Sequence, residues 1–337
     1  MYKIGFACKY MHDNQNLPKK ELEALERSYN TRAVTLKWLR SVDRKTAEER
    51  LFEVIEHNLS SQYNILNYVN TLPENLKMMR ISSDLLPLYT HSEYSYFYSS
   101  NLIKEYISSE FSKIGEFARK NNIRLSMHPG QFCVLASDRP DVVLNSIDEF
   151  EYHADMIRMM GYGQQFQDFK CNVHIAGGLG VDGVLAILPK ISDVAKNTIT
   201  FENEERKYGL DDCLKLSDHC PVVLDIHHCW INEGNYIDHN DDRVKRVIDS
   251  WRGVRPTMHY SQSRESLLDL GFDSDSKLDM TSLLEQVNKK DLSAHSDKMW
   301  NHWCNLYAKE FLNDFDIMFE AKHKNLAVLE FYKKYLI

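Results

Sequence analysis

Short apolar runs alternate with longer amphipathic stretches along the whole chain. Runs of four to eight residues rich in β-branched, aromatic and other large apolar side chains predict strands. These runs are KIGFAC (3–8), KMMRIS (77–82), IRLSMH (123–128), CNVHIA (171–176), TITFEN (198–203), VVLDIHH (222–228), PTMHYS (256–261) and FDIMFE (315–320). Between them, stretches such as 47–69, 103–121 and 142–160 repeat apolar residues at helical spacing. This repeated strand–helix alternation predicts an α/β protein, a (β/α)₈ TIM-type barrel.

The domain organisation follows from what separates these elements. No linker rich in proline, glycine or serine and no low-complexity tract interrupts the pattern. We therefore expect residues 1–337 to form a single TIM-barrel domain. Residues 12–30, between the first strand and its helix, are predicted to form a long loop with a short helix. Long loops at the carboxyl ends of barrel strands usually carry function.

Composition narrows the class of protein. The chain has 337 residues, of which 43% are hydrophobic, so it can bury a large core without cross-links. Its seven cysteines form no C-x-x-C pair, which favours reduced thiols and a cytoplasmic location. No apolar run approaches the roughly 18 residues of a membrane span, so we expect no membrane contact. The net charge of -8 weighs against a polyanionic partner. A cluster of metal-binding carboxylates would remove this objection, because bound cations reverse the local charge.

Side chains that bind divalent metals fall at the ends of six predicted strands. They are His128, His174, Glu202, Asp225, His227, His228, His259 and Glu320. His91 and His295 lie in neighbouring predicted loops. The active face of such a barrel is the rim at the carboxyl ends of its strands. Imidazoles and carboxylates without thiolates suit Mn²⁺, Zn²⁺, Fe²⁺ or Mg²⁺, and so many ligands indicate more than one ion, as in the two-metal sites that hydrolyse phosphodiesters.

Each of these residues also has a structural interpretation. A lone histidine at a strand end is more often a hydrogen-bonded core residue than a ligand, and Asp225 or Glu202 alone could cap a helix. Six strands that all end in such residues are difficult to explain by packing, which favours a multinuclear metal site. The remaining histidines show no such placement and are expected to be surface or core residues: His12, His57, His153, His219, His239, His302 and His323.

The ordered set of short motifs resembles the UV-damage endonuclease family. The motifs are RISSDLLP with the following TH (80–91), LSMHPGQF (125–132), NVHIAGG (172–178), FENEE (201–205), VVLDIHHCW (222–230), MHYSQSR (258–264), SAHSD (293–297) and FEAKHKNLA (319–327). The resemblance implies a TIM-type barrel with two or three divalent metal ions, often Mn²⁺, with Zn²⁺ or Mg²⁺ as alternatives. It also implies an enzyme that nicks double-stranded DNA 5′ to cyclobutane pyrimidine dimers and 6-4 photoproducts. We expect it to act as a monomer.

The resemblance also assigns individual residues. Its metal ligands would be His91, His128, His174, Glu202, Asp225, His228, His259, His295 and Glu320, which leaves His227 as a neighbour. Gln131 and Phe132 would wedge into the duplex opposite the lesion, since apolar side chains pushed out by a Pro-Gly turn can unstack bases. Phe6 and Tyr10 would contact the lesion. Among the basic residues near the rim, which include Arg80, we expect Lys322 to act with Glu202 and Glu320 in catalysis, because it lies next to the last ligand.

Three positions depart from the family pattern. Thr257 stands where the family has a lysine that can be carboxylated to bridge metals, which indicates fewer metals or a different bridge. Tyr10 replaces an asparagine, which puts the lesion preference in doubt, and Phe132 replaces a tyrosine. Two other functions stay open at this point. A metal-dependent sugar isomerase on the same barrel would have a small closed pocket and no exposed wedge. A non-catalytic DNA-damage-binding protein would bind lesions without nicking.

Overall fold

A computed structural model describes all 337 residues of the chain. Each of the eight predicted strands is found, and all of them run parallel in one sheet. The strands are β1 (Ile4–Ala7), β2 (Met78–Arg80), β3 (Arg124–Met127), β4 (Lys170–His174), β5 (Ile199–Glu202), β6 (Val222–Val223), β7 (Thr257–Tyr260) and β8 (Asp316–Phe319). Their order is β6-β5-β4-β3-β2-β1-β8-β7. A parallel bridge between Asp225 and His259 joins the two edges, so the sheet closes into the predicted barrel.

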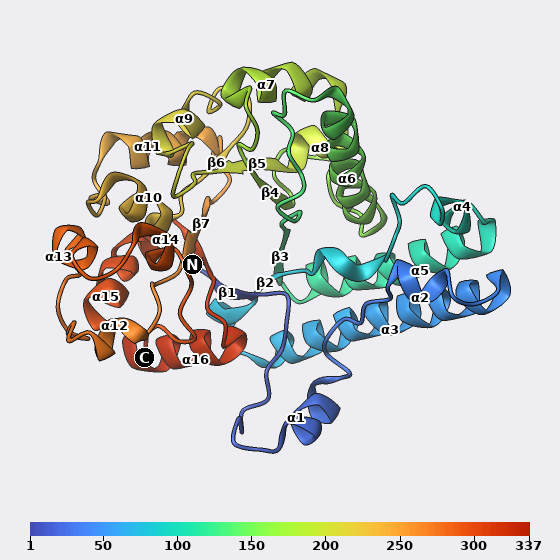
Figure 1. Ribbon diagram of the computed structural model, residues 1–337, viewed down its shortest axis with the longest axis horizontal. Helices are drawn as coiled ribbons and strands as arrows, with labels where there is room; N and C mark the ends of the chain where they lie inside the picture. Colours follow the sequence, from blue (N-terminus) through green and yellow to red (C-terminus); the bar gives the residue numbers. More distant parts are fainter.

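Helices surround the strands on all sides (Figure 1). They are α1 (Lys19–Glu26), α2 (Leu36–Leu39), α3 (Arg44–Thr71), α4 (Ser95–Tyr98), α5 (Asn101–Lys120), α6 (Pro140–Met159), α7 (Gly180–Ile187), α8 (Asp193–Thr198), α9 (Leu210–Leu214), α10 (Ile226–Glu233), α11 (Asp242–Ser250), α12 (Ser266–Asp269), α13 (Met280–Leu284), α14 (Lys289–Leu292), α15 (His302–Glu310) and α16 (Lys324–Tyr335). Short 3₁₀ turns are η1 (Glu74–Leu76), η2 (Ser83–Leu85), η3 (Leu188–Lys190) and η4 (Phe311–Asn313). No helix combines the length and the apolar composition that a membrane span needs.

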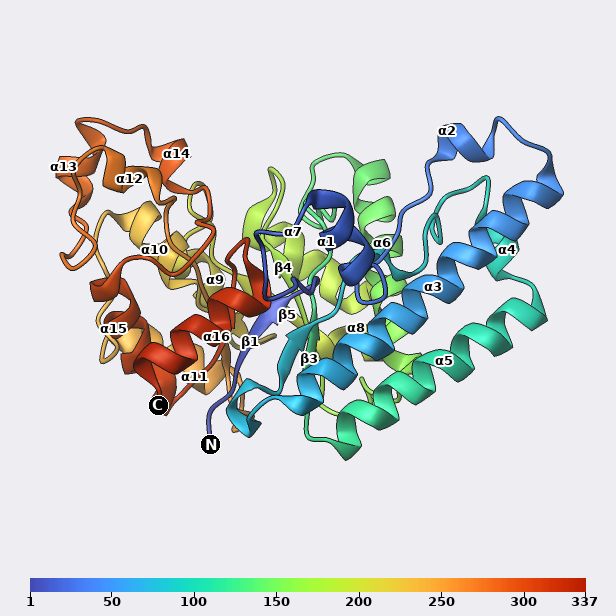
Figure 2. The same cartoon turned by 90° about the horizontal axis from the view of Figure 1, so that it is seen from below.

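The three longest helices confirm the amphipathic stretches of the sequence as α3, α5 and α6. The first begins at Asp43, whose carboxylate accepts a hydrogen bond from the backbone N–H of Thr46 at 3.1 Å, a common N-cap arrangement. Its buried side chains, such as Leu51, Ile55 and Leu59, recur at helical spacing and face the core. Helices α3 and α5 lie side by side along one flank of the barrel (Figure 2). The segment 12–30 is a loop that carries α1, as expected.

The two faces of the sheet differ in chemistry. Outward-facing strand residues such as Phe6, Met79 and Ile317 join the large apolar core beneath the helices. The lumen of the barrel holds only a small apolar cluster of Ala7, Met78 and Met318. Because side chains alternate along a strand, the polar residues buried on the remaining strands also face the lumen: Ser126, Lys170, Asn172, Thr200 and Thr257. This barrel therefore has a polar interior beneath its functional rim.

Ion pairs fill the opposite, amino-terminal end of the lumen. The Asp316 carboxylate accepts hydrogen bonds from Arg124 Nη1 at 2.5 Å and from Arg255 Nε at 2.8 Å. Both arginines also donate to backbone carbonyls. These ion pairs lie at the amino-terminal end, so they are separate from the polar residues at the carboxyl ends of the strands. The bottom of the barrel thus acts in stability and the top is available for function.

Candidate metal centre

Glu202 lies at the centre of the polar cluster on the rim. It ends β5, and its side chain is 1% exposed. Its Oε2 atom is 3.0 Å from His259 Nδ1, 3.4 Å from His128 Nε2 and 3.9 Å from His174 Nε2. One carboxylate oxygen therefore faces imidazoles from β4, β7 and the end of β3. This arrangement brings together residues that are far apart in the sequence because their strands end at the same rim.

Glu320, just after β8, and Asp225, just after β6, extend the cluster. Glu320 Oε1 lies 3.4 Å from His259 Nδ1, and Glu320 Oε2 lies 3.8 Å from His295 Nδ1. Asp225 Oδ2 is 3.7 Å from His228 Nδ1. The structure thus joins eight of the nine expected ligands in one cluster: His128, His174, Glu202, Asp225, His228, His259, His295 and Glu320.

The protonation states of the cluster suit metal binding. Burial alone would raise the pKa of Glu202, but the rings of His259 and His174 hold that pKa well below its ordinary value. Arg80 has the main lowering effect on the pKa of the buried Glu320 carboxyl. Burial also lowers the pKa of His259 to about 4. Burial raises the pKa of Asp225 to about 8, and the Asp225 and Glu202 carboxylates raise the pKa of His228 to about 9 against the effect of burial. Charged Glu202 and Glu320 beside neutral His259 are thus in the forms that bind a cation, whereas Asp225 and His228 would have to lose protons to bind one.

Several buried polar atoms of the cluster have no hydrogen-bond partner. They include His259 Nδ1, His174 Nδ1 and Asp225 Oδ2. Buried polar atoms in folded proteins are nearly always satisfied, so several open atoms within one cluster need an explanation. Two groups, His128–His174–Glu202 and Glu202–Asp225–His259, each bring three ligand atoms within 4.8 Å of one another. The residues present fit divalent cations with nitrogen and oxygen ligands.

Two asparagines support the ligands: Asn172 holds the Glu202 carboxylate, and Asn203 holds the backbone of Asp225. Asn172 donates to Glu202 Oε2 and accepts a hydrogen bond from Thr200 Oγ1 at 2.9 Å. The side-chain amide of Asn203 donates to the Asp225 carbonyl and accepts from the Asp225 backbone N–H, both at 2.9 Å. The backbone carbonyl oxygen of Asn203 lies 3.0 Å from His228 Nδ1. Such supporting partners orient metal ligands. Sequence reasoning did not assign either residue, although Asn172 lies two residues before His174 and therefore shares its inward face.

Two basic residues also enter the cluster. Arg80, expected only as one of several basic residues near the rim, is buried and pairs with Glu320. Lys170 was not singled out from the sequence at all. Its Nζ atom lies 2.7 Å from His259 Nε2, and burial lowers its pKa to about 7. No motif marks Lys170, because its role depends on a contact across the lumen.

His91 and Lys322 are not joined to this cluster. His91 lies in the loop after η2, and its Nδ1 accepts a hydrogen bond from the backbone N–H of Glu93 at 3.2 Å. No ion pair or ring contact links it to the other eight ligands. Lys322 Nζ lies 3.2 Å from Asp297 Oδ1, and half of its side chain is exposed. Both positions are set by loops, so the barrel strands do not fix their side chains.

The expected wedge is exposed, whereas the expected lesion contacts near β1 are not. Phe132 is 83% exposed after the Pro129–Gly130 turn, and Gln131 beside it is also exposed. Phe6 is 1% exposed, and its ring makes an edge contact with the ring of Tyr68 on α3, with 6.4 Å between the two ring centroids. This corrects the expectation that Phe6 stacks on a lesion, because β1 points the ring outward into the core.

Tyr10 requires the same correction. Its ring packs against Tyr29 at 4.4 Å and against Tyr68 at 4.8 Å between centroids. The backbone N–H and carbonyl of Tyr10 are both bonded to the side chain of Asn30. A ring in this position is not available to a base unless the loop leaves the core. The structure therefore contradicts the expected contact of Tyr10 with DNA.

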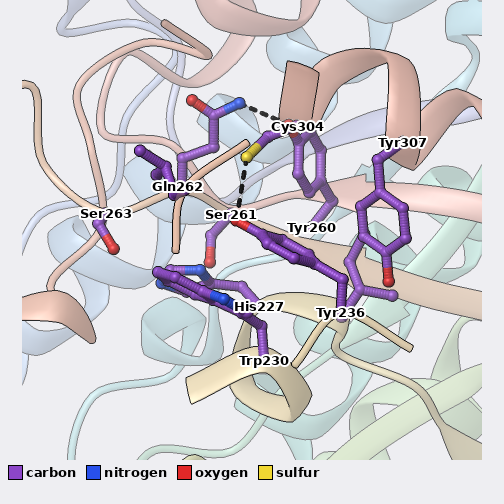
Figure 3. A pocket seen from close by; sticks show the side chains of 11 residues that line it. His227, Trp230, Tyr236, Tyr260, Ser261, Gln262, Ser263, Cys304 and Tyr307 are labelled. Atoms are coloured by element: carbon purple, nitrogen blue, oxygen red, sulfur yellow. Dashed lines mark hydrogen bonds between the residues drawn. The ribbon is translucent and has the colours of Figure 1, made fainter. Parts of the chain in front are cut away.

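His227 lies beside the cluster, with its ring centroid 6.2 Å from that of His295, in agreement with its assignment as a neighbour. Figure 3 shows its ring beside Trp230 and Ser261 in a small cavity of about 10 Å³. Its Nε2 atom and the Ser261 hydroxyl have no partner there. A cavity of this size accommodates about one water molecule. This cavity is far too small for a sugar substrate.

Comparisons with known proteins agree with this geometry. A family model described as UV-endonuclease UvdE matches residues 3–336. A UV DNA damage endonuclease of Bacillus velezensis is 27% identical over 313 residues, which cover 88% of this chain and 87% of the relative. One from Bacillus thuringiensis subsp. konkukian is 24% identical and covers 89% and 87%. The crystal structure of SacUVDE matches 99% of this chain and 97% of its own, with 24% identity and a TM-score of 0.72. Endonuclease IV from Thermus thermophilus shares the fold at 12% identity, with a TM-score of 0.51 and coverage of 81% and 93%.

Proposed function

Because the chain belongs to the UV-endonuclease UvdE family, we propose that this DNA repair endonuclease nicks duplex DNA on the 5′ side of cyclobutane pyrimidine dimers and 6-4 photoproducts by metal-assisted phosphodiester hydrolysis. The observation that carries the proposal is the cluster of eight imidazole and carboxylate ligands around Glu202, with the exposed Phe132 on the same rim. The cluster offers the chemistry, and the aromatic side chain offers a means of probing the duplex.

The carboxylates and imidazoles would hold two or three divalent ions, with Mn²⁺ as the first choice and Zn²⁺ or Mg²⁺ as alternatives. Bound ions of this kind lower the pKa of water and stabilise the charge that develops on phosphate oxygens. The protein keeps Glu202 and Glu320 ionised through the nearby histidines and Arg80. Asn172 fixes the direction of the Glu202 carboxylate, and Asn203 fixes the backbone of Asp225. His91 completes the proposed ligand set after movement of its loop.

The DNA-binding role of Gln131 and Phe132 follows from their exposure. The Phe132 ring is 83% exposed, so it is free to contact a partner. Insertion of such a ring between base pairs unstacks and kinks the duplex. Damaged pairs open at lower cost than intact ones, so the wedge would select lesions without reading the base sequence. Phe6 and Tyr10 have no part in this proposal.

Lys322 would act on the scissile phosphate. Its half-exposed side chain stands at the rim next to Glu320, and its exposed ion pair with Asp297 is weak enough to exchange for a phosphate contact. The backbone N–H of Lys322 donates to the Ser296 carbonyl at 3.0 Å, which ties this residue to the loop that carries His295. The Lys322 side chain would leave Asp297 to contact a phosphate held at the metals.

The two alternative functions predict different surfaces. A sugar isomerase needs a small closed pocket and has no use for an exposed wedge, so the exposure of Phe132 favours the nuclease. A lesion-binding protein without catalysis has no need for a complete ligand set, and here eight ligands are in contact. The eight ligands therefore lie together even though Thr257 replaces the lysine of the family pattern.

A plasmid assay tests the proposal. Supercoiled DNA, either ultraviolet-irradiated or intact, is incubated with the metal-free protein and Mn²⁺, with EDTA as the control. We expect conversion of irradiated plasmid to the nicked circle, no conversion of intact plasmid and complete inhibition by EDTA. Nicking that is equal on both substrates would contradict the damage specificity, and nicking that survives EDTA would contradict the metal mechanism.

A further inference from the structure

The loop that carries Gln131 and Phe132 has an exposed tip and a buried base. We call residues 129–139, between β3 and α6, the wedge loop. The Cys133 backbone N–H donates to the Gly130 carbonyl at 3.0 Å, which closes a turn with Gln131 and Phe132 at its two central positions. Both central side chains are exposed, whereas Cys133 just beyond the turn is buried. The wedge therefore projects from a base that neighbouring elements can hold in place.

Ser146 of α6 ties one side of this base to a helix. Its hydroxyl accepts a hydrogen bond from the Val134 backbone N–H at 2.8 Å and donates one to the Val142 carbonyl at 2.7 Å. The Cys133 thiol donates to the backbone carbonyl of Ser146 at 3.6 Å. Because Ser146 is buried, water does not compete for these bonds. The residues that follow the wedge are thus bonded to a rigid element.

The loop between β4 and α7 ties the other side of the base. The Ala136 backbone N–H donates to the Ala176 carbonyl at 3.0 Å, and the Leu179 backbone N–H donates to the Ala136 carbonyl at 2.9 Å. Between these two contacts Gly177 has a φ of 114°, and a Cβ there would lie 2.2 Å from the Ala136 carbonyl oxygen. The Tyr208 hydroxyl donates to the Gly177 carbonyl at 2.6 Å. Only glycine allows the two backbones to pack this closely.

These anchors bear on lesion selection because a wedge must meet the duplex in a fixed direction. A loop that is already ordered loses little conformational freedom when it inserts, whereas a mobile loop loses more. Insertion contributes to binding only where the base stack opens, and damaged pairs open at lower cost. A loosened wedge loop should therefore weaken the response to paired damaged DNA and leave substrates that are already open unaffected.

We propose that Ser146 is a positioning residue for the wedge: together with the packing of Gly177 on Ala136, it holds the wedge loop in the conformation that inserts into damaged DNA. The inference rests on the proposed function, because it takes Gln131 and Phe132 to enter the duplex. Ser146 is buried beneath the loop and acts through the backbone that follows the wedge. It is not a catalytic residue.

A double-mutant cycle on single-turnover nicking with Mn²⁺ tests the proposal. One change is Ser146→Ala, and the other is the wedge-less variant, Gln131→Ala combined with Phe132→Ala. Each protein is given a cyclobutane dimer in a paired duplex and the same dimer in an unpaired bubble, where no stack has to be opened. The quantity compared is the ratio of the nicking rate on the duplex to that on the bubble. A 2-aminopurine base opposite the dimer in the duplex reports unstacking on binding, independently of cleavage.

Ser250→Ala is the matched control for the loss of a buried helix serine. The Ser250 hydroxyl accepts from the Val222 backbone N–H at 3.0 Å and donates to the Val247 carbonyl at 2.6 Å, at the amino-terminal end of β6. Both serine variants should lose a similar amount of stability. We expect Ser146→Ala to lower the duplex-to-bubble ratio by about fivefold, the effect of one lost hydrogen bond, and to reduce the 2-aminopurine signal. Ser250→Ala should leave both unchanged, and Ser146→Ala should have no further effect in the wedge-less background.

A wild-type ratio in Ser146→Ala, or an equal loss in the presence and in the absence of the wedge, would overturn the proposal. An equal loss in Ser250→Ala would do the same, because the effect would then come from stability alone. A wedge-less variant with the wild-type ratio would instead contradict the wedge role in the proposed function. A wild-type protein that unstacks the 2-aminopurine but does not nick would count against the proposed catalysis alone, and the fluorescence of the variants would then decide on Ser146.

If Ser146→Ala does not fold, the glycine contact decides. Gly177→Ala would force the Ala136 carbonyl, and with it the wedge loop, out of its place. Gly253→Ala is the control, because Gly253 also has a positive φ, of 88°, and no atom lies within 4 Å of the position of a Cβ there. We expect the duplex-to-bubble ratio to fall in Gly177→Ala and to stay at the wild-type value in Gly253→Ala. Equal ratios in the two glycine variants would overturn the proposal.

Discussion

The guanidinium of Arg80 pairs with the carboxylate of Glu320 inside the barrel, whereas the other ionisable neighbours of that carboxylate are the histidines His259 and His295. Arg80 lies on β2 and Glu320 just beyond the end of β8, so the pair joins two strands that β1 separates in the sheet. In the protein without bound metal, this arginine is the cation that balances Glu320. The pair therefore links the stability of the barrel to the charge of its functional site.

Replacement of Arg80 should expose this link. Arg80→Met leaves Glu320 buried without its counter-ion, and loss of one partner of a buried pair costs about 3–5 kcal/mol. We expect the free energy of unfolding of the metal-free variant to fall by about 3 kcal/mol, and Mn²⁺ to restore stability more strongly than in wild type. Denaturant titrations with EDTA and with Mn²⁺ measure both effects. Arg40→Met is the control, since its pair with Glu93 is exposed and should matter little.

Removal of a central carboxylate should abolish cleavage, and Glu202→Ala, which breaks no arginine pair, should also spare the fold. Glu202→Ala or Glu320→Ala deletes a negative charge from the ligand cluster, and a metal ion supplies several kcal/mol of transition-state stabilisation. A loss of about 3 kcal/mol corresponds to about a 100-fold lower rate, so we expect at least about that decrease. Single-turnover nicking rates and metal analysis of both variants provide the check. A variant that retains wild-type rates would show that its carboxylate is not a ligand.

The wedge should act in discrimination and not in folding. The double variant Gln131→Ala with Phe132→Ala should retain wild-type stability, because both side chains are exposed. Its preference for damaged over intact duplex should decrease more than its rate on a substrate that is already unpaired. Binding titrations with both duplexes measure this. Leu102→Ala is the matched control, because Leu102 on α5 is 78% exposed outside the rim. An unchanged preference for damaged over intact duplex in the double variant would contradict a wedge role for Gln131 and Phe132.

His153 should make the protein sensitive to acid. It is fully buried in α6, with Nε2 2.9 Å from Ser83 Oγ and Nδ1 2.7 Å from the Glu149 carbonyl. Burial lowers its pKa from 6.5 to about 4, so the folded state binds fewer protons than the unfolded state. The contribution of neutral His153 to the free energy of unfolding is complete above pH 6.5 and is lost as the pH falls toward 4.

This shift corresponds to about 3 kcal/mol. In EDTA, the stability of His153→Gln should therefore fall less steeply between pH 6.5 and 4 than that of wild type. The nearest ionisable groups are the Glu149 carboxylate, 3.8 Å from Nδ1, and His128. Both remain in the variant. Denaturant titrations at several pH values measure the two slopes, and identical slopes would show that His153 does not carry the effect.

Strand ends could be predicted from the sequence because barrel geometry fixes them. Eight apolar runs correspond to eight strands, and a residue such as Glu202 or His259 at the end of a run necessarily faces the common rim. Contacts across the lumen could not be predicted in this way. Lys170 begins a strand that reads as apolar, and its partner is a ring 89 residues away. This contact becomes visible only when both strands are placed.

The surroundings of several residues could not be predicted from the sequence, for related reasons. Motif similarity placed Phe6 at the lesion, but alternation along β1 decides the face, and the register directs the ring to the core. Tyr10 and His91 lie in loops, whose course depends on side-chain contacts such as that with Asn30 and not on periodicity. Lys322 lies near the rim, but its direction in the structure is set by Asp297.

The position of the nick on a defined substrate tests the central claim most directly. A duplex with one cyclobutane dimer, labelled at the 5′ end of the damaged strand, is incubated with wild-type protein and Mn²⁺, and the product is sized at single-nucleotide resolution. The account predicts one product that ends immediately 5′ to the dimer, absent with EDTA and absent with Glu202→Ala. A ladder of products that is the same on the undamaged duplex, or no product with any divalent metal, would contradict it.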